Sequence, residues 1–237
     1  MSSNQTENKT TPRIRVITSV LKGALKLFLR SQVSDIEDLD IDIQASDRQL
    51  LSGVIPKVSV FASGAVYKGL HITSVQLAAE NIRINTGSIL KGQSLRLSEA
   101  IPVSGTLVLE EEDINASLTS ALLSSALNDV LLQLIPELAK NSKSIIWKKI
   151  ILSNNRFTLF ANPTAQTNTK PEPPLKIGID LELLNSQELK LTPTLQHSEK
   201  FHKVNGQHFD LGSDVDIEEL DLTPGKVTCK GRINVNP

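Results

Sequence analysis

Residues 70–85 read LHITSVQLAAENIRIN and keep the alternation of a β-strand over a greater length than an ordinary strand. The apolar side chains occupy even positions, then odd positions, and then even positions again: Leu70 and Ile72, then Val75, Leu77 and Ala79, then Ile82 and Ile84. Because successive side chains of a strand point to opposite faces, each change of phase either turns the buried face over or requires a bulge, and bulges bend a strand. Strands usually have about five or six residues. The segment therefore predicts a long, bent strand in a large curved sheet.

The composition favours one sizeable domain and argues against several functions. With 237 residues, of which 39% are hydrophobic, the chain can bury a large core. A formal net charge of -1 and an aromatic content of 3% argue against a nucleic-acid partner. Cys229 is the only cysteine. We therefore expect no disulfide framework and no thiolate metal cluster, and we expect this side chain to pack in the core.

The two ends of the chain differ in composition. Residues 1–12 are polar and predict a disordered tail, and residues 13–237 predict a single domain with a flexible loop at 163–174. The apolar stretch that follows the tail is interrupted by Lys22 and Lys26 and has no small-residue cleavage site, so we expect no secretory signal. The expected location is cytoplasmic, peripheral on the inner or thylakoid membrane.

Residues 14–32 have the period of an amphipathic α-helix. Its apolar face is centred on Ile14, Ile17, Leu21, Leu25 and Phe28. The opposite stripe carries the basic residues Arg15, Lys22, Lys26 and Arg30. Such a helix is attracted to an anionic membrane surface, where each Lys or Arg contributes about 1 kcal/mol. The alternative is a helix that packs on the sheet and whose solvated basic face is balanced by the acidic segment that follows.

A second helix is predicted over residues 114–134. The acidic residues at 111–113 suit the positive end of a helix. Apolar residues begin as a stripe and surround the helix near its C-terminal end, which is typical of a buried helix. Asp129 argues against a membrane span, since an Asp at the centre of a spanning helix costs about 2.5 to 3.5 kcal/mol. We expect the curved sheet to bury this helix, and Pro136 to end or kink it.

The remaining alternating segments predict further strands. They cover residues 36–44, 57–62, 66–68, 94–97, 101–110, 144–153, 156–162, 175–184, 188–195, 214–222 and 226–235. Asn154 and Asn155 predict one hairpin turn, and Pro224 and Gly225 predict another. The fold class expected from these elements is α+β: a long, strongly curved antiparallel sheet that wraps a buried apolar helix, with an N-terminal amphipathic helix.

Five segments together carry a resemblance to a known family. They are DRQLLSGVIPKVSV at 47–60, AVYKGLHITSVQL at 65–77, ENIRIN at 80–85, IPVSGTLVL at 101–109 and EEDINASL at 111–118. The chain resembles the bacterial LmeA-like phospholipid-binding domain, which is best populated in cyanobacteria and actinobacteria. The resemblance implies a fold like the tubular lipid-binding domains, in which a curved antiparallel sheet wraps a long helix and encloses an apolar groove. It also implies binding of a phospholipid rather than catalysis.

A lipid groove would need an aliphatic wall with few polar groups. The candidate wall combines the long strand with the second helix: Leu70, Ile72, Val75, Leu77, Ile82, Ile84, Leu118, Leu122, Leu123 and Leu127. The partners expected are a phospholipid or another amphiphile and an anionic membrane surface. The alternative is a closed core, which would make the chain a structural or assembly factor whose basic helix docks a protein. A hydrolase that acts on a lipid is a third alternative.

We predict no catalytic residue, cofactor or metal. The sequence has no glycine-rich phosphate loop and no nucleophile elbow. His197, His202 and His208 match no zinc spacing. The alternating acidic residues at 35–42 and 214–221 are typical of solvated strand faces and lack the spacing of a calcium loop.

Overall fold

The protein is α+β with two open antiparallel sheets. The computed structural model describes residues 14–85, 97–136, 145–163, 174–195 and 206–236. The six-stranded sheet has the order β1-β2-β3-β4-β11-β10, with β1 at Asp38–Gln44, β2 at Val54–Tyr67, β3 at Leu70–Arg83, β4 at Ile101–Glu110, β10 at Val215–Thr223 and β11 at Lys226–Val235. The five-stranded sheet runs β5-β6-β7-β8-β9, with β5 at Ile145–Ser153, β6 at Arg156–Pro163, β7 at Leu175–Asn185, β8 at Glu188–Leu195 and β9 at Gln207–Asp210. The sequence predicted one wrapping sheet, and the structure divides it into two.

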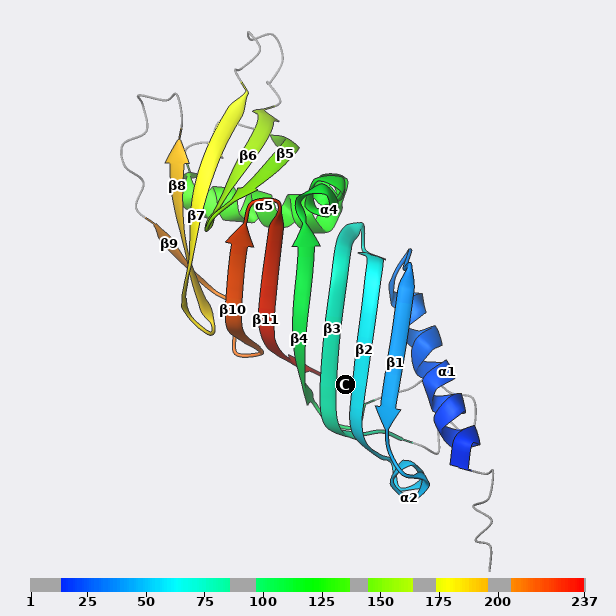
Figure 1. Ribbon diagram of the computed structural model, residues 1–237. Coiled ribbons are helices and arrows are strands. Elements are labelled where there is room, and N and C mark those ends of the chain that lie inside the picture. Colours follow the sequence, from blue (N-terminus) through cyan, green and yellow to red (C-terminus); the bar gives the residue numbers. More distant parts are fainter. Residues whose placement is uncertain (1–13, 86–96, 137–144, 164–173, 196–205, 237) are drawn as a thin grey trace, which may run out of the picture.

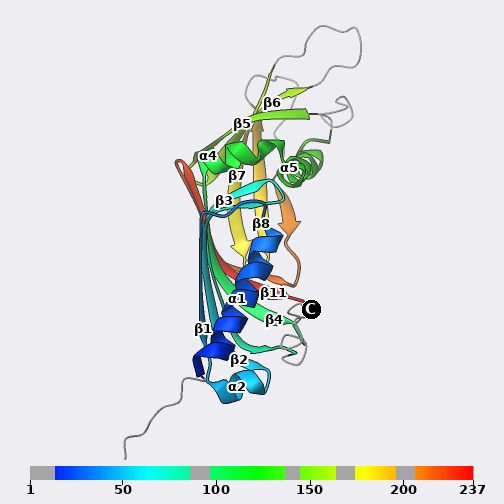
Figure 2. The ribbon, with the colours of Figure 1, turned by 90° about the vertical axis from the view of Figure 1, so that its right-hand side faces the viewer.

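Helices cover one face of each sheet. They are α1 at Ile14–Gln32, α2 at Asp47–Leu51, α4 at Glu111–Ala116, the 3-10 helix η1 at Ser117–Thr119 and α5 at Ala121–Leu134. Helix α1 lies along the six-stranded sheet, whereas α4 and α5 lie where the two sheets meet (Figure 1). Seen from the side, the six-stranded sheet curves, and α1 lies on one side of it (Figure 2). We call this side of the six-stranded sheet the inner face and the opposite side the outer face.

The predicted N-terminal helix is confirmed with its bounds. Leu21 of α1 is buried in a core with Ile41 and Ile43 of β1 and Leu50 of α2. Ser46 begins α2 as its N-cap, because its backbone N–H donates to Gln49 Oε1 at 2.9 Å. The apolar face of α1 therefore packs on the inner face of the sheet.

The two phase changes of the long strand are real, but they are not bulges. Strands β2 and β3 form one hairpin of 14 residues each, turning at Lys68 and Gly69. In the ladder between β2 and β3, Gly64 and Thr73 face each other without being paired, and the register is the same before and after them. It does the same at Asn81 and the residue that faces it. Gly64 has φ of 57° and Asn81 has φ of 55°.

Burial shows what these two positive φ angles do. In β3, Ala79 and Ile82 are both buried, while the two residues between them are exposed. In β2, buried Ala62 is likewise followed by buried Ala65, three positions later. Across Gly64 and across Asn81 the apolar side chains return to the same face without an inserted residue. The facing residues Thr73 and Pro56 change phase with them, although neither has positive φ. For the same reason β2 is continuous, where the sequence predicted separate strands at 57–62 and 66–68.

The helical segment after β4 differs from the prediction. In place of one helix over 114–134, the chain forms α4, η1 and α5, because Ser120 is extended and its Oγ accepts a hydrogen bond from Leu123 N–H at 3.1 Å. The long strand does not bury α5. Buried Leu131 and Leu134 of α5 instead share a core with β5–β8, which includes Leu159, Ile177 and Ile179. Nor is α5 apolar and buried all round, since Leu122 and Leu132 are 43% and 49% exposed.

Turns of the second sheet bond to the edge strand β10. The N–H of Ile217 donates to the carbonyl oxygen of Ser186 at 2.7 Å, and the N–H of Asn155 donates to that of Leu222 at 3.1 Å. Both predicted hairpin turns are confirmed, and Gly225 has φ of 80°. The predicted tail at 1–12 and nearly all of the loop at 163–174 lie outside the described residues, as does the strand at 94–97 except for Leu97, which bridges Ile84.

Candidate functional site

An apolar cavity of about 810 Å³ lies between α1 and the inner face of the six-stranded sheet. Helix α1 contributes Leu25, Phe28 and Leu29 to its wall. The strands contribute aliphatic side chains, among them Ile55, Val58, Leu77, Ala79, Ile82, Ile84, Ile101 and Val103. Among the described residues that line it, only Asn236 has a polar side chain. The cavity therefore suits a hydrocarbon rather than a polar substrate.

The phase change at Asn81 builds one end of this cavity. Leu77 and Ala79 face inward at odd positions, and Ile82 faces inward at an even position because Asn81 turns the alternation over. Under strict alternation Ile82 would lie on the outer face. The phase change at Asn81 therefore keeps the wall aliphatic from Leu77 to Ile84.

A second hollow of about 280 Å³ lies beside the first, over β3, β4, β11 and β10. The two share Leu77 and Val103 in their linings. Cys229 lines the smaller hollow, where the sequence predicted a core side chain. Burial raises the pKa of the Cys229 thiol above its usual value. We call the two spaces the larger and the smaller compartment.

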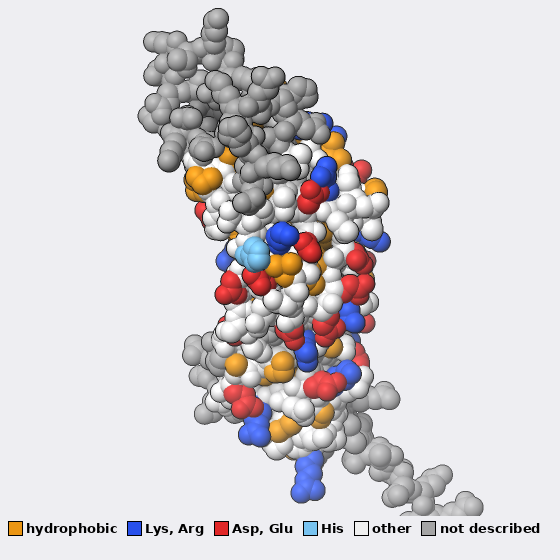
Figure 3. All heavy atoms as spheres, turned by 90° about the vertical axis from the view of Figure 1, so that its left-hand side faces the viewer, with side chains coloured by type: hydrophobic (Ala, Val, Ile, Leu, Met, Phe, Trp, Pro, Cys, Tyr) orange, Lys and Arg blue, Asp and Glu red, His pale blue; other side chains and the backbone are white. Residues whose placement is uncertain are grey.

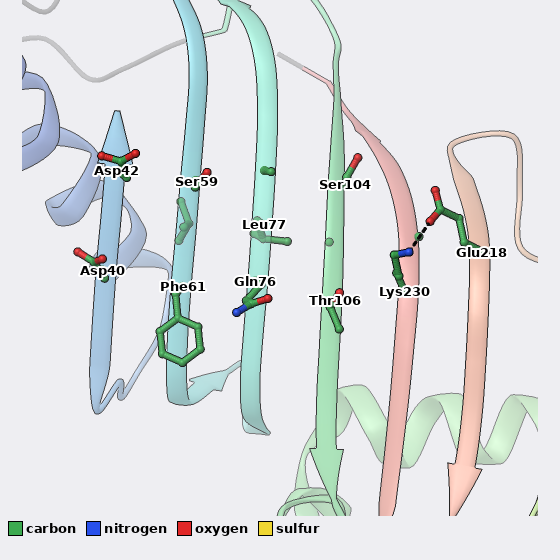
Figure 4. Close-up of a pocket in the computed structure, with 14 residues that line it drawn as sticks. Asp40, Asp42, Ser59, Phe61, Gln76, Leu77, Ser104, Thr106, Glu218 and Lys230 are labelled. Atoms are coloured by element: carbon green, nitrogen blue, oxygen red, sulfur yellow. Dashed lines mark ion pairs between the residues drawn. The ribbon is translucent and has the colours of Figure 1, made fainter. Parts of the chain in front are cut away.

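The outer face of the same sheet is mostly polar, with Phe61, which is 39% exposed, as an apolar exception. An open hollow of about 370 Å³ lies there. Figure 4 shows Asp42, Ser59, Gln76 and Ser104 of its lining on neighbouring strands. Lys230 Nζ lies 3.3 Å from Glu218 Oε2 beside it. Within the described part of the chain, no group of three or more His, Cys, Asp or Glu side chains is placed to hold a metal ion. His197 and His202 lie outside the described residues.

The structure does not bring the ten predicted wall residues together. Leu77, Ile82 and Ile84 line the larger compartment, and Val75 lines the smaller one. Leu70 and Ile72 lie beyond the first phase change, where they are only half-buried. The four predicted residues of the second helix belong to the other end of the molecule, where Leu118 and Leu127 are buried in the second core, Leu123 packs against that core and Leu122 is exposed.

The helical wall of the cavity comes from α1. The sequence had marked the apolar face of this helix, including Leu25 and Phe28, but assigned that face to a membrane surface or to packing. Leu29, which also lines the cavity, was not singled out. Its spacing of four residues from Leu25 could have placed it on the same apolar face, because residues four apart lie on one side of a helix.

The residues of the predicted basic stripe differ in their contacts. Lys22 Nζ lies 3.6 Å from Asp40 Oδ1 of β1, as the alternative interpretation expected. Lys26 and Arg30 are exposed and make no ion pair with a described residue. The side chain of Arg15 lies outside what the structure describes. The exposed side of α1 also carries Leu27, which is 73% exposed.

Figure 3 shows a different side of the molecule, the left-hand side of Figure 1. Acidic and basic side chains alternate there, with hydrophobic side chains scattered between them. The basic residues of α1 therefore contrast with the mixed charge of that face.

The comparisons with known proteins give one family. The family model described as LmeA-like phospholipid-binding matches residues 13–232. No curated protein and no solved structure matches the chain. Among the described residues, no helix has the length and apolar character that a membrane span needs.

Proposed function

The chain belongs to the LmeA-like phospholipid-binding family, and on that premise we propose that it binds a phospholipid or a similar amphiphile in the cavity under α1, without making or breaking a bond. The observation that carries the proposal is the larger compartment, with its volume of about 810 Å³ and its almost wholly aliphatic wall. Ligand sites in proteins commonly have volumes of roughly 300 to 1,000 Å³.

An acyl chain is the ligand that such a wall favours. Apolar cavities hold water poorly, so the wall has no good partner until a hydrocarbon fills it. Each CH₂ group that enters contributes about 0.8 kcal/mol. A headgroup gains nothing from this wall and would stay at the rim, where Asn236 offers a polar side chain.

Helix α1 supports a role at a membrane surface. Val20 and Leu27 are 52% and 73% exposed on the helix whose other side lines the cavity. Lys26 and Arg30 accompany them and are free of ion pairs with described residues. We propose that this side of α1 contacts an anionic membrane, so that peripheral association brings the cavity close to lipid. Lys22 contributes less, because it pairs with Asp40.

Native mass spectrometry of the full chain, purified under gentle conditions, tests lipid binding. We expect a co-purifying amphiphile close to one per chain, which solvent extraction and fragmentation then identify. A chain that carries no lipid in repeated preparations, and takes none from vesicles of palmitoyl-oleoyl phosphatidylglycerol, contradicts the proposal and favours the closed-core alternative.

The absence of bond cleavage is tested separately. Radiolabelled phosphatidylglycerol incubated with the protein should be recovered intact. Release of a labelled fatty acid or headgroup above the rate without protein would instead favour the hydrolase alternative.

A further inference from the structure

The inner face of the sheet continues past the larger compartment. Direct pairing places Val75, Leu107 and Cys229 in one row across β3, β4 and β11, and Leu77, Gly105 and Gly231 in the next row. Residues paired in this way share a face of the sheet. The smaller compartment therefore extends the apolar wall across four strands, a width of about 14 Å at the usual strand spacing.

The two compartments meet at Leu77 and its paired residue Gly105. We call this boundary the divide, and it is low because Gly105 has no side chain. A Cβ at position 105 would lie 2.7 Å from Leu77 Cδ2 and 3.0 Å from the carbonyl oxygen of Gln76. The side chain of Leu77 thus lies over the backbone of β4, in space that any other residue at 105 would occupy. A larger residue would push Leu77 away and raise the divide.

The smaller compartment is open to solvent at Ile233, which pairs with Val103, a residue that lines both compartments. Ile233, which lines it, is 47% exposed on the inner face. This side chain adds to the apolar surface of the hollow, and an acyl chain lying there would cover it. Cys229 lies in the same hollow and is half-buried.

From this geometry we infer that the site selects two-chain lipids: one acyl chain fills the larger compartment under α1, and the second crosses Leu77 above Gly105 into the smaller compartment beside Cys229. The inference rests on the proposed lipid binding and adds the class of lipid. A single-chain amphiphile fills the larger compartment and leaves the smaller one empty. The selectivity follows from the joined shape of the two spaces and needs no contact with the headgroup.

Cys229 reports directly on the smaller compartment, because it is the only cysteine in the chain. The experiment exposes the delipidated full chain to vesicles of palmitoyl-oleoyl phosphatidylglycerol or to palmitoyl lysophosphatidylglycerol. Alkylation by iodoacetamide is then followed by intact mass at alkaline pH, since the burial of the thiol raises its pKa. The two-chain lipid should slow alkylation by about tenfold, whereas the one-chain lipid should leave the rate within about twofold of that of the empty protein.

Gly105→Val tests the divide, and Ser104→Val is its matched control. Ser104 is the preceding residue of β4 and is exposed on the outer face. Gly105→Val should lower binding of the two-chain lipid by about tenfold or more beyond any change in binding of the one-chain lipid, because the displaced Leu77 also lines the larger compartment. Ser104→Val should bind both lipids as the wild type does. If Gly105→Val does not fold, Cys229→Phe fills the smaller compartment from its other side, and native mass spectrometry reads the same loss.

Three outcomes separate this inference from the function on which it rests. Equal protection of Cys229 by the one-chain and two-chain lipids overturns the inference, because one chain then reaches both compartments. Unchanged two-chain binding in folded Gly105→Val, or in Cys229→Phe where Gly105→Val does not fold, also overturns it and leaves lipid binding intact. A wild type that binds neither lipid overturns the proposed function itself.

Discussion

Asn115 of α4 pairs with both backbone groups of Ile150 in β5. Its Nδ2 donates to the Ile150 carbonyl oxygen at 2.9 Å, and its Oδ1 accepts from the Ile150 N–H at 2.8 Å. Glu111 Oε2 accepts from the next outward N–H, that of Leu152, at 2.7 Å. Strand β5 is an edge of the second sheet, where backbone groups would otherwise lack partners. Side chains of α4 therefore take the place of a neighbouring strand.

Asn115→Leu should lower the free energy of unfolding by about 2 kcal/mol, because it leaves both the N–H and the carbonyl of Ile150 without a partner. Urea denaturation followed by the fluorescence of Trp147, the only tryptophan, measures the change. Trp147 is suited to this because it is buried in the second core. Asn162→Leu, at an exposed asparagine of β6, is the control and should have little effect. Equal losses in the two variants would contradict the role of Asn115.

Asn81→Val should destabilise the protein by about 1 to 2 kcal/mol relative to Asn81→Gly, since a β-branched residue at positive φ is strained and glycine is not. Asn81 is exposed, so neither change alters the core. Denaturant unfolding of the two variants gives the difference. If they are equally stable, the conformation at residue 81 is not the constraint that sets the phase change.

The sequence of residues 70–85 located both irregularities of the long strand, because apolar phase can be read from a single chain. It did not reveal their kind. A bulge and a residue at positive φ produce the same phase change, and only the partner strand separates them. Gly64 and Asn81 were signals for positive φ, since both residue types tolerate it, but the partner of Asn81 is known only once β2 and β3 are paired.

The candidate site was predictable only in part. The bounds of α1 and its apolar face follow from period alone. The prediction was wrong about which helix faces β3. The apolar pattern of a helix such as α5 shows that it is buried but not which sheet covers it. Ile177 and Ile179 of β7 are fully buried beside α5, yet in the sequence they resemble any alternating strand. Contacts between segments so far apart leave no mark in the period of either one.

Val58→Phe should reduce bound lipid by at least about tenfold while leaving the free energy of unfolding unchanged or slightly raised, because the added ring fills an existing cavity. Ser59→Phe is the control, since the neighbouring residue lines the hollow of the outer face. Native mass spectrometry measures the lipid, and thermal unfolding without lipid measures stability. A Val58→Phe protein that carries as much lipid as the wild type would move the site away from the larger compartment.

The ion pair of Arg156 and Asp180 should make a small, pH-dependent contribution to the free energy of unfolding. Arg156 Nη2 donates to Asp180 Oδ2 at 2.7 Å, and this hydrogen bond holds the pKa of Asp180 below its usual 3.8. A lowered carboxyl pKa stabilises the fold above the unfolded value, and that stability is lost as pH falls through the folded value. Both side chains are more than a third exposed, so we expect less than about 1 kcal/mol.

Asp180→Asn measures that contribution. The variant should be slightly less stable than the wild type at neutral pH, and the difference should shrink as pH falls below about 4. Urea midpoints across this range give the comparison. A difference that stays constant from neutral to acidic pH would mean that the lost side-chain packing, rather than the charge, is responsible.

Reversing the charges of Lys26 and Arg30, which form no ion pair with a described residue, should weaken membrane association. With each Lys or Arg contributing about 1 kcal/mol at an anionic surface, Lys26→Glu combined with Arg30→Glu should lower the vesicle partition coefficient by about 30-fold or more. Flotation with phosphatidylglycerol vesicles measures the change, which should diminish as salt is added and should be small with phosphatidylcholine. Lys148→Glu combined with Lys149→Glu makes the same charge change on exposed residues of β5 and should leave flotation near that of the wild type. Equal losses in both double variants would assign the effect to net charge, and flotation unchanged in both would leave α1 as a wall of the cavity alone.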